Sequence, residues 1–290
     1  MRAQKIWPNG LRYLWTDAFG VVLLVSLYEA LGDKKYLTDA EQVVAEVDRV
    51  LGRERGIRIG EEADRDGQYF HYLAMWLYAL AMLARHVPEY RQKGVDLVHE
   101  IHQPFLLPGR GVFWKMQEDL SGPYPGYGLG ALDCFDGYIC YRLLDEKALA
   151  VEIADMKKLI DVTYADLVIT QDLGLGMMLW LCHFFPAENW AVLQKRRCLE
   201  MLELMWRDAG YFCREPDLPD TRFAFTNYGV SIGLQAVGAM DSRVTQLNEY
   251  FDQYRSGDEY DYSAITHVMA CNSIFPGRLI NGNHFPHYVT

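Results

Sequence analysis

Two kinds of helical pattern alternate along the chain. Residues 13–31 carry the unbroken apolar run VVLLV at 21–25, so the middle of this segment is apolar on all sides. Residues 38–51 instead repeat apolar side chains such as Val43 and Val47 at helical spacing, with charged residues on the opposite face. A helix that is apolar all round is buried, and an amphipathic helix lies at the surface. The pattern therefore predicts a buried helix followed by a surface helix.

The same pair recurs along most of the chain. Later pairs are expected at 68–86 with a helix from Pro88, 131–144 with 147–164, 174–185 with 189–206, and 228–240 with 242–254. A sixth buried helix begins near Tyr262, but residues 276–290 are too short and too rich in Pro and Gly for a full outer partner. Strand patterns are confined to short stretches such as 111–115, which favour small ribbons in loops.

Repeated helix pairs of roughly 35–50 residues are typical of an open solenoid or a closed toroid. In a toroid the inner helices are covered on both sides and are apolar all round, as they are here. The sequence therefore predicts an all-α fold, an (α/α)6 barrel or toroid of helical hairpins with an incomplete sixth hairpin. We expect residues 1–290 to form this single domain, closed by the N-terminal segment or by another chain. An open helical array is the alternative.

Loop lengths indicate which end of the barrel carries a site. Turns from inner to outer helices are short, whereas the returns at 52–67, 103–130 and 207–227 are long. All returns lie at one mouth of an alternating toroid, and the inner helices point their positive N-terminal ends at the same mouth. Since long ordered loops on a rigid scaffold usually carry function, we expect the site there.

Composition and charge restrict the classes of partner. Half of the 290 residues are hydrophobic and 23% are charged, so the chain can bury a large core. The net charge of −11 argues against nucleic-acid binding and against docking on anionic membranes. The six cysteines form no CxxC pair, the first ten residues lack a signal-peptide pattern, and the longest apolar run is too short to span a bilayer. We therefore expect a cytoplasmic protein without a membrane span that binds a small-molecule substrate, in an oligomeric state that the sequence leaves open.

Polar residues, most of them acidic, stand where the inner helices begin. Two carboxylates can divide the roles of general acid and base when their surroundings separate their pKa values. Helix capping is the more common role for any single one of them, because acidic side chains suit the positive end of a helix. The candidates for general acid or base, taken from these helix starts and from the long loops, are Asp17, Glu62, Asp66, Glu118 and Asp136.

Aromatic and cationic residues gather in the same segments. Aromatic faces beside acidic groups suit a sugar ring, whose apolar face stacks and whose hydroxyls need acceptors, and they equally suit a cationic intermediate. A guanidinium such as that of Arg65 can hold a carboxylate or a phosphate. The candidates for substrate binding are Trp15, Arg65, His71, Trp114, Tyr124, Tyr127 and Asn227.

Several well-marked catalytic motifs are absent from the sequence. It contains no Walker A loop and no GxGxxG, GxSxG or HExxH motif. Asp133 and Asp136 share one helix face and could share a Mg²⁺ ion, but one short motif is too unspecific to assign a metal. We therefore predict neither a metal site nor a cofactor.

The inner-helix starts also carry a resemblance to a known group of barrels. The segments Trp15-Thr16-Asp17 and Asp136-Gly137-Tyr138, with the repeated hairpins and the aromatic mouth, resemble the six-hairpin glycosidases, which include unsaturated glucuronyl hydrolases. The resemblance covers about residues 12–275 and rests on architecture rather than on a residue-for-residue signature. It implies an α/α barrel and glycosidase-like acid–base catalysis on a small saccharide or uronate, without assigning a catalytic pair.

Two other functions fit the same pattern. Terpene cyclases share helical hairpins, aromatic cavities and acidic residues, so a cyclase or isomerase acting on an apolar substrate is one alternative, although neither DxDD nor DDxxD occurs. A non-catalytic toroid that binds a ligand or a partner protein is the other. Its sign would be a mouth whose carboxylates are all hydrogen-bonded caps with ordinary pKa values.

Overall fold

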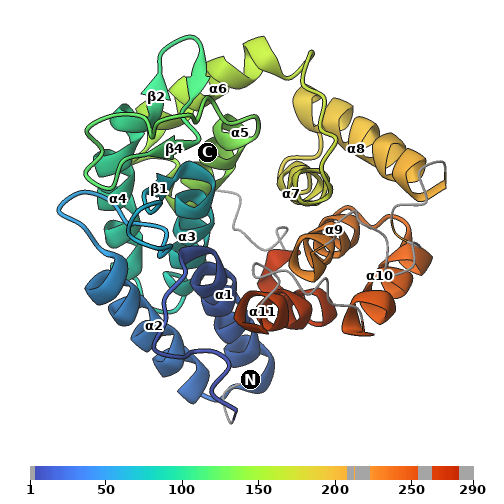
Figure 1. Ribbon diagram of the computed structural model, residues 1–290, viewed down its shortest axis with the longest axis horizontal. Helices are drawn as coiled ribbons and strands as arrows, with labels where there is room; N and C mark the ends of the chain where they lie inside the picture. The colour runs from blue at the N-terminus through green and yellow to red at the C-terminus, as the bar shows by residue number, and fades with distance from the viewer. Residues whose placement is uncertain (1–3, 208–211, 213–222, 254–262, 281–290) are drawn as a thin grey trace. The chain divides into compact units, whose positions relative to one another are not determined.

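The computed structural model describes residues 4–207, Phe212, 223–253 and 263–280 of the chain (Figure 1). By its packing the chain divides into two compact units, Met1–Thr163 and Tyr164–Thr290. The described residues are mostly helical, and their strands are two residues long. The prediction of an all-α protein is confirmed.

The first unit consists of three helical hairpins arranged in two layers (Figure 1). One layer holds the apolar helices, which pack side by side: α1 (Leu14–Leu31), α3 (Phe70–Leu83) and α5 (Asp133–Asp145). The other layer holds their amphipathic partners: α2 (Lys35–Leu51), α4 (Glu89–Phe105) and α6 (Ala150–Thr163). Large side chains of the apolar layer, such as Trp76 and Tyr141, are wholly buried, whereas α2 buries a single stripe. The division into buried and surface helices is as predicted.

Helix α1 is the most apolar of the long helices. Among the described residues it alone is long and apolar enough to cross a membrane by length and composition, and 72% of it is buried inside the fold. The core helix of a globular domain reaches the same apolarity, which fits the packing of α1 against α2 and α3.

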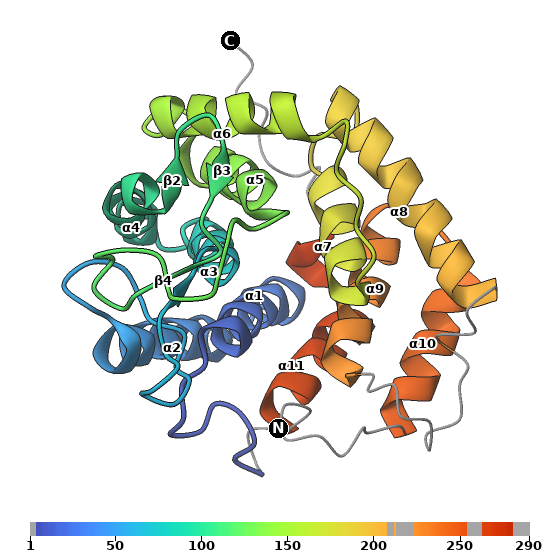
Figure 2. The same cartoon turned by 45° about the horizontal axis from the view of Figure 1, so that its top comes forward.

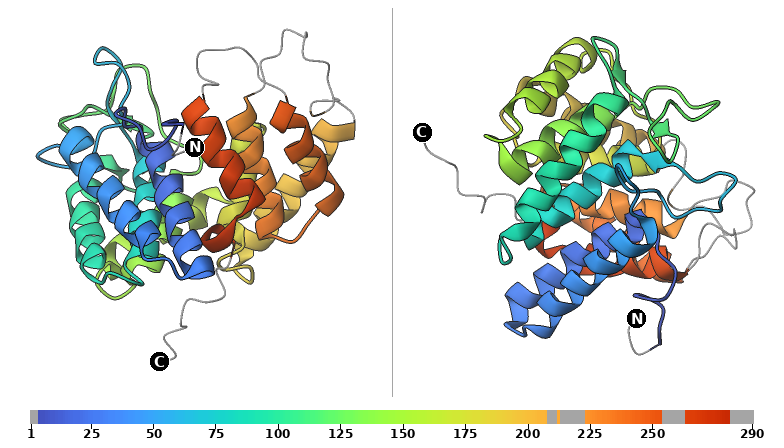
Figure 3. Two further views of the ribbon diagram at one scale, coloured as in Figure 1. Left: turned by 90° about the horizontal axis from the view of Figure 1, so that it is seen from below. Right: turned by 90° about the vertical axis from the view of Figure 1, so that its left-hand side faces the viewer.

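Short strands gather at the end of the first unit where α1, α3 and α5 begin (Figure 3). Strand β1 (Gln68–Tyr69) pairs with β4 (Lys115–Met116), and β2 (Leu106–Leu107) pairs with β3 (Gly111–Val112), both antiparallel. The ribbon expected at 111–115 is therefore present. The β1–β4 pair ties the long loop after α4 to the start of α3, and the β2–β3 pair closes a hairpin within that loop.

Several helix boundaries differ from the predicted ones by a few residues, and two of them are explained by contacts with distant parts of the chain. Helix α3 begins at Phe70 rather than at Gln68, because the backbone of Gln68 pairs with β4 and its side chain bonds to the loop backbone at Arg55, Ile57 and Glu118. Helix α4 continues through Pro104, which has no N–H for the carbonyl of Glu100. That carbonyl accepts a hydrogen bond from the Arg55 guanidinium at 2.9 Å instead, so the helix tolerates proline in its last turn.

The second unit repeats the arrangement of apolar and amphipathic helices. Its apolar helices are α7 (Asp172–Cys182), α9 (Ala224–Ala236) and α11 (Ser263–Ile274), and its amphipathic ones are α8 (Asn189–Arg207) and α10 (Asp241–Gln253). After α11 the described chain forms only a 3-10 turn, η2 (Gly277–Leu279), which fits the incomplete sixth hairpin. The indole N–H of Trp180 donates to the carbonyl of Leu279 at 2.8 Å and attaches this turn to α7.

Helices α7 and α9 lie side by side with their backbones in direct contact (Figure 2). A Cβ atom on Gly233 would lie 2.1 Å from the carbonyl oxygen of Gly176, and one on Gly176 would lie 2.4 Å from that of Gly229. No real Cβ approaches a backbone oxygen so closely, so only glycine fits these positions.

Candidate functional site

An imidazole and a carboxylate meet where α3 and α5 begin. His71 is the second residue of α3 and Asp136 lies in the first turn of α5, with 2.8 Å between Nδ1 of His71 and Oδ2 of Asp136. The Asp136 side chain is 1% exposed and that of His71 is 16% exposed. Because the carboxylate accepts the proton of Nδ1, Nε2 is the nitrogen left for proton exchange. Among the described residues it has no hydrogen-bond partner.

A second buried carboxyl group adjoins this His71–Asp136 dyad. Asp133 is 3% exposed, accepts a hydrogen bond from the backbone N–H of His71, and has no described partner for Oδ1. Burial, together with the charge of Asp136, raises the pKa of Asp133 well above its ordinary value. Burial alone would lower the pKa of His71, but the charge and hydrogen bond of Asp136, with the charge of Asp133, raise it overall.

An indole fixes the imidazole from the side. The ring of Trp15 lies 4.7 Å from that of His71 at an interplanar angle of 32°, and 5.2 Å from that of Tyr72. Trp15 is 1% exposed, so it supports His71 from inside the fold and does not line an open surface. The hydroxyl of Tyr72 lies 2.6 Å from that of Tyr13, which links the start of α3 to the start of α1.

Three aromatic rings beside the dyad form a surface that we call the aromatic platform, defined by Tyr69, Trp114 and Tyr127. Trp114 stacks on Tyr69 at 5.5 Å and 9° and lies 5.2 Å from Tyr127. Trp114 is 44% exposed, so part of its ring is open to solvent. Its carbonyl accepts the N–H of Phe70, the residue before His71, at 3.1 Å. The platform is therefore held next to the dyad through the backbone.

Comparison with solved structures identifies the fold. No protein-family model and no curated sequence matches the chain. A sugar epimerase from a ruminal bacterium matches with a TM-score of 0.62 and 14% identity, covering 91% of this chain and 87% of that one. The cellobiose 2-epimerase of Spirochaeta thermophila matches with a TM-score of 0.63 and 13% identity, covering 93% and 86%. That of Bacillus thermoamylovorans matches with a TM-score of 0.57 and 11% identity, covering 91% and 87%.

The chain has the sugar-epimerase fold. This fold is the (α/α)6 barrel of the six-hairpin glycosidase-like group, so the predicted barrel is confirmed and the open helical array is not.

Within this epimerase fold, the predicted carboxylates have different surroundings. Asp17 is 1% exposed, accepts from the indole N–H of Trp7 at 2.8 Å and lies 3.3 Å from the guanidinium of Arg12. Burial raises its pKa to about 6, although Arg12 and Trp7 act in the opposite direction. Asp66 is paired with Arg58 and accepts the backbone N–H groups of Gly60 and Gly67. Both carboxylates attach neighbouring segments to the start of a helix or strand.

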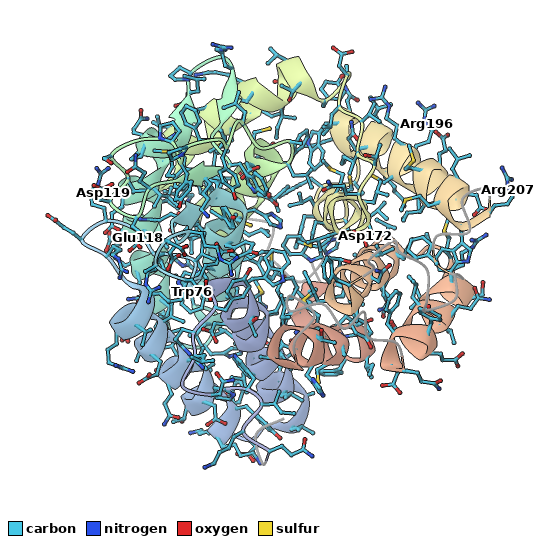
Figure 4. The ribbon with its side chains drawn as sticks, viewed as in Figure 1. Trp76, Glu118, Asp119, Asp172, Arg196 and Arg207 are labelled. Carbon is cyan, nitrogen blue, oxygen red and sulfur yellow. The ribbon has the colours of Figure 1, made fainter. Side chains whose placement is uncertain are left out.

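The two predicted glutamates lie in the long loops before and after helices α3 and α4. Glu118 forms an ion pair with Arg53 at 2.6 Å, in the loop that also carries Asp119 (Figure 4). The Glu62 side chain is 77% exposed and lies 3.7 Å from Arg65. These hydrogen bonds and ion pairs of the four carboxylates do not involve His71, so Asp136 is the predicted carboxylate that meets the imidazole. Catalytic roles for Asp17, Glu62, Asp66 and Glu118 stay predictions without support from their contacts.

The predicted binding residues divide similarly. His71 and Trp15 meet at the dyad, and Trp114 and Tyr127 meet in the platform, with Tyr124 5.6 Å from Tyr127. The side chain of Arg65 faces Glu62.

Asn227 belongs to α9 in the second unit. It donates to Asp172 at 3.2 Å and to the carbonyl of Phe223 at 2.8 Å. Its predicted role in substrate binding stays a prediction.

Two residues at the site were not among the candidates. Asp133 stands three residues before Asp136, a spacing that places both on one helix face. From the sequence this spacing suggested a shared metal ion, whereas in the structure both side chains lie beside His71. Lys115 follows Trp114 in the chain and is wholly buried. A charged residue in a predicted loop is expected at the surface, so the sequence does not indicate this burial. No group of three His, Cys, Asp or Glu side chains that could hold a metal ion occurs in the described part of the chain.

Proposed function

We propose that this protein is a carbohydrate-active enzyme that moves a proton at the carbon beside the carbonyl of a small reducing saccharide. The observation that supports this most directly is the His71–Asp136 dyad, whose Nε2 has no described partner. The fold supports the choice of substrate, because its structural neighbours are a sugar epimerase and two cellobiose 2-epimerases. The partly exposed Trp114 offers a flat apolar face to a sugar ring.

Inversion at carbon 2 of a sugar is a proton-transfer reaction. In the open-chain form, carbon 1 is an aldehyde and acidifies the C2–H bond. A base removes this proton, the electron pair forms the C1–C2 double bond, and the negative charge moves to O1. Protonation of C2 on the opposite face gives the epimer. Neutral His71, with Nδ1–H held by Asp136, presents Nε2 as the base for one face.

Proton transfer by His71 fits the burial of the site better than hydrolysis by a carboxylate pair. Hydrolysis needs two carboxyl groups that flank the glycosidic bond. Asp133 and Asp136 are 3% and 1% exposed and are both engaged with His71, so neither is open to a substrate. The imidazole is the more exposed partner. We therefore favour epimerisation or isomerisation over the hydrolytic version of glycosidase-like catalysis.

Solvent isotope exchange tests the proposal. The enzyme is incubated in D₂O with cellobiose, glucose, mannose and glucuronate, and the H2 signal and the epimer are followed by ¹H NMR. We expect loss of the H2 signal with formation of the 2-epimer. His71→Gln should slow this exchange by about 10³-fold, the size of a general-base contribution.

The matched control is His99→Gln on the surface helix α4, since the His99 side chain is 51% exposed. Its rate should equal that of the wild type. Release of new reducing ends without deuterium at C2 would replace the proposal with hydrolysis. Full activity of His71→Gln would remove the dyad from the mechanism, and inertness toward all four sugars would favour the cyclase or the non-catalytic toroid.

A further inference from the structure

A lysine outside the dyad is buried among tyrosine rings. Lys115, on β4, is 1% exposed and stands opposite Tyr69 of β1 in the strand register. Burying an ammonium group is costly unless its charge and its three N–H groups find partners. The surroundings of Lys115 therefore show what the fold gains by enclosing it.

Each donor of the ammonium has an oxygen near it. Nζ donates to the backbone carbonyl of Arg65, lies 3.3 Å from the hydroxyl of Tyr69, and lies 3.4 Å from Oε2 of Glu61. Two of these partners come from the loop at 52–67 and one from β1. The ammonium thus connects that loop to the strand that leads into α3.

Three phenol rings surround the same charge and form what we call the tyrosine cage. The distances from Nζ to the ring centroids are 4.3 Å for Tyr124, 4.7 Å for Tyr69 and 5.1 Å for Tyr127. All three lie within the range in which a ring face attracts a cation, and burial strengthens that attraction because little water competes.

The cage and the aromatic platform share two members, Tyr69 and Tyr127. Tyr69 carries the stacked ring of Trp114, and Tyr127 lies beside Trp114. Tyr124 joins the cage to both loops: its N–H donates to the carbonyl of Lys115 at 2.9 Å and its hydroxyl donates to that of Asp64 at 2.9 Å. Displacement of the ammonium would therefore release the rings that support Trp114.

We propose that Lys115 is a positioning residue that fixes Trp114 and Tyr127 as a stacking subsite for a pyranose ring. The ligand class rests on the proposed function, whereas the positioning of Trp114 does not. The subsite binds the sugar without taking part in proton transfer, so loss of the cation should weaken saccharide binding and leave the chemical step at His71 unchanged.

The test replaces the cation by an uncharged side chain of similar length. In Lys115→Met we expect KM for the saccharide to rise about tenfold, equal to about 1.4 kcal/mol, with kcat within twofold of the wild type. Acrylamide should quench Trp114 more strongly in the variant, measured as the fluorescence difference between each protein and its Trp114→Phe derivative. Lys93→Met is the matched control, because it removes the same cation from the surface. Lys93 pairs with Asp48, and their side chains are 38% and 39% exposed. This control should change neither quantity.

A second pair of variants keeps the proposal testable if Lys115→Met does not fold. Tyr124→Leu removes the nearest ring of the cage, whereas Tyr124→Phe keeps the ring and removes only the hydroxyl. The leucine variant should show the stronger Trp114 quenching and the higher KM. Unchanged Trp114 quenching in both Lys115→Met and Tyr124→Leu would overturn the proposal whether or not the protein acts on sugars. If an active enzyme showed altered Trp114 quenching but an unaltered KM for the saccharide, the proposal that Trp114 and Tyr127 form a sugar subsite would be overturned.

Discussion

The starts of the apolar helices in the two units use the same residue type for different purposes. In the first unit Asp136 binds an imidazole, a group that exchanges protons near neutral pH. In the second unit Asp172, at the start of α7, accepts hydrogen bonds from the hydroxyl of Thr226 at 2.8 Å and the amide of Asn227 at 3.2 Å (Figure 4). Neither of those donors titrates in the physiological range. A helix-start aspartate therefore becomes a candidate for chemistry through its partner, not through its position.

Asp17, at the start of α1, is a third case. Its partners are the indole of Trp7 and the guanidinium of Arg12, both supplied by the segment before the helix. A guanidinium keeps its charge at all accessible pH values, so in this pair only the carboxyl group of Asp17 exchanges a proton, and the pairing attaches the N-terminal segment to the helix.

Replacing Asp136 and Asp172 by asparagine, one at a time, tests whether the partner of a helix-start aspartate decides its role. Asp136→Asn should lower kcat for isotope exchange by about 10³-fold, because an amide at this position no longer selects the Nδ1–H form of His71. Asp172→Asn should stay within twofold, since its oxygen still accepts from Thr226 and Asn227. Equal losses in the two variants would show that position, and not the partner, decides the role. Circular dichroism and melting temperature check that both variants fold.

The buried carboxyl group of Asp17 should make stability depend on pH. Its pKa is about 6 in the folded protein against 3.8 for the free group, so the folded state retains a proton that the unfolded chain has released. The free energy of unfolding should therefore fall by about 2 kcal/mol between pH 4 and pH 6 through this group, since the slope reaches about 1.4 kcal/mol per pH unit only between the two pKa values. In Asp17→Asn this contribution should vanish. Urea unfolding of both proteins across that range measures the difference, and parallel curves would contradict it.

The smallest expected effect concerns the titration of His71. Asp136 raises the pKa of this imidazole, and a general base works only when it is neutral. Activity should therefore be lost on the acid side at a pH above 6.5, the ordinary value for histidine. In Asp136→Asn the attraction is removed and burial remains, so the pKa should fall. An NMR titration of the imidazole C–H signals follows this directly, and an unmoved midpoint would mean that Asp136 does not set the pKa.

Most of the fold is predictable from the sequence because each helix type has its own pattern. The unbroken apolar run of α1 and the single stripe of α2 differ enough to separate buried from surface helices. The exceptions depend on long-range contacts. Gln68 resembles the start of a helix, but it pairs with β4, nearly fifty residues later in the chain. Pro104 resembles a helix end, but Arg55 takes over its missing hydrogen bond.

The site is less predictable because it depends on which side chains meet. The sequence supplied His71 and Asp136 as separate candidates, and only the packing of α3 against α5 makes them a pair. Glu118 was an equal candidate from the sequence, but in the structure it pairs with Arg53, which lies 65 residues earlier in the chain. Lys115 gave no signal as a buried residue, since its cage combines rings from β1 and from the loop after β4.

The contact between α7 and α9 has a consequence for how much the second unit can change. Gly176 and Gly233 bring main-chain atoms of the two helices together, and Gly229 leaves room for the side chain of Leu173. A larger residue at Gly176 or Gly233 would push the two axes apart, because it would meet backbone atoms, which cannot rotate away as a side chain can. This contact is therefore a place where the second unit accepts little change in its sequence.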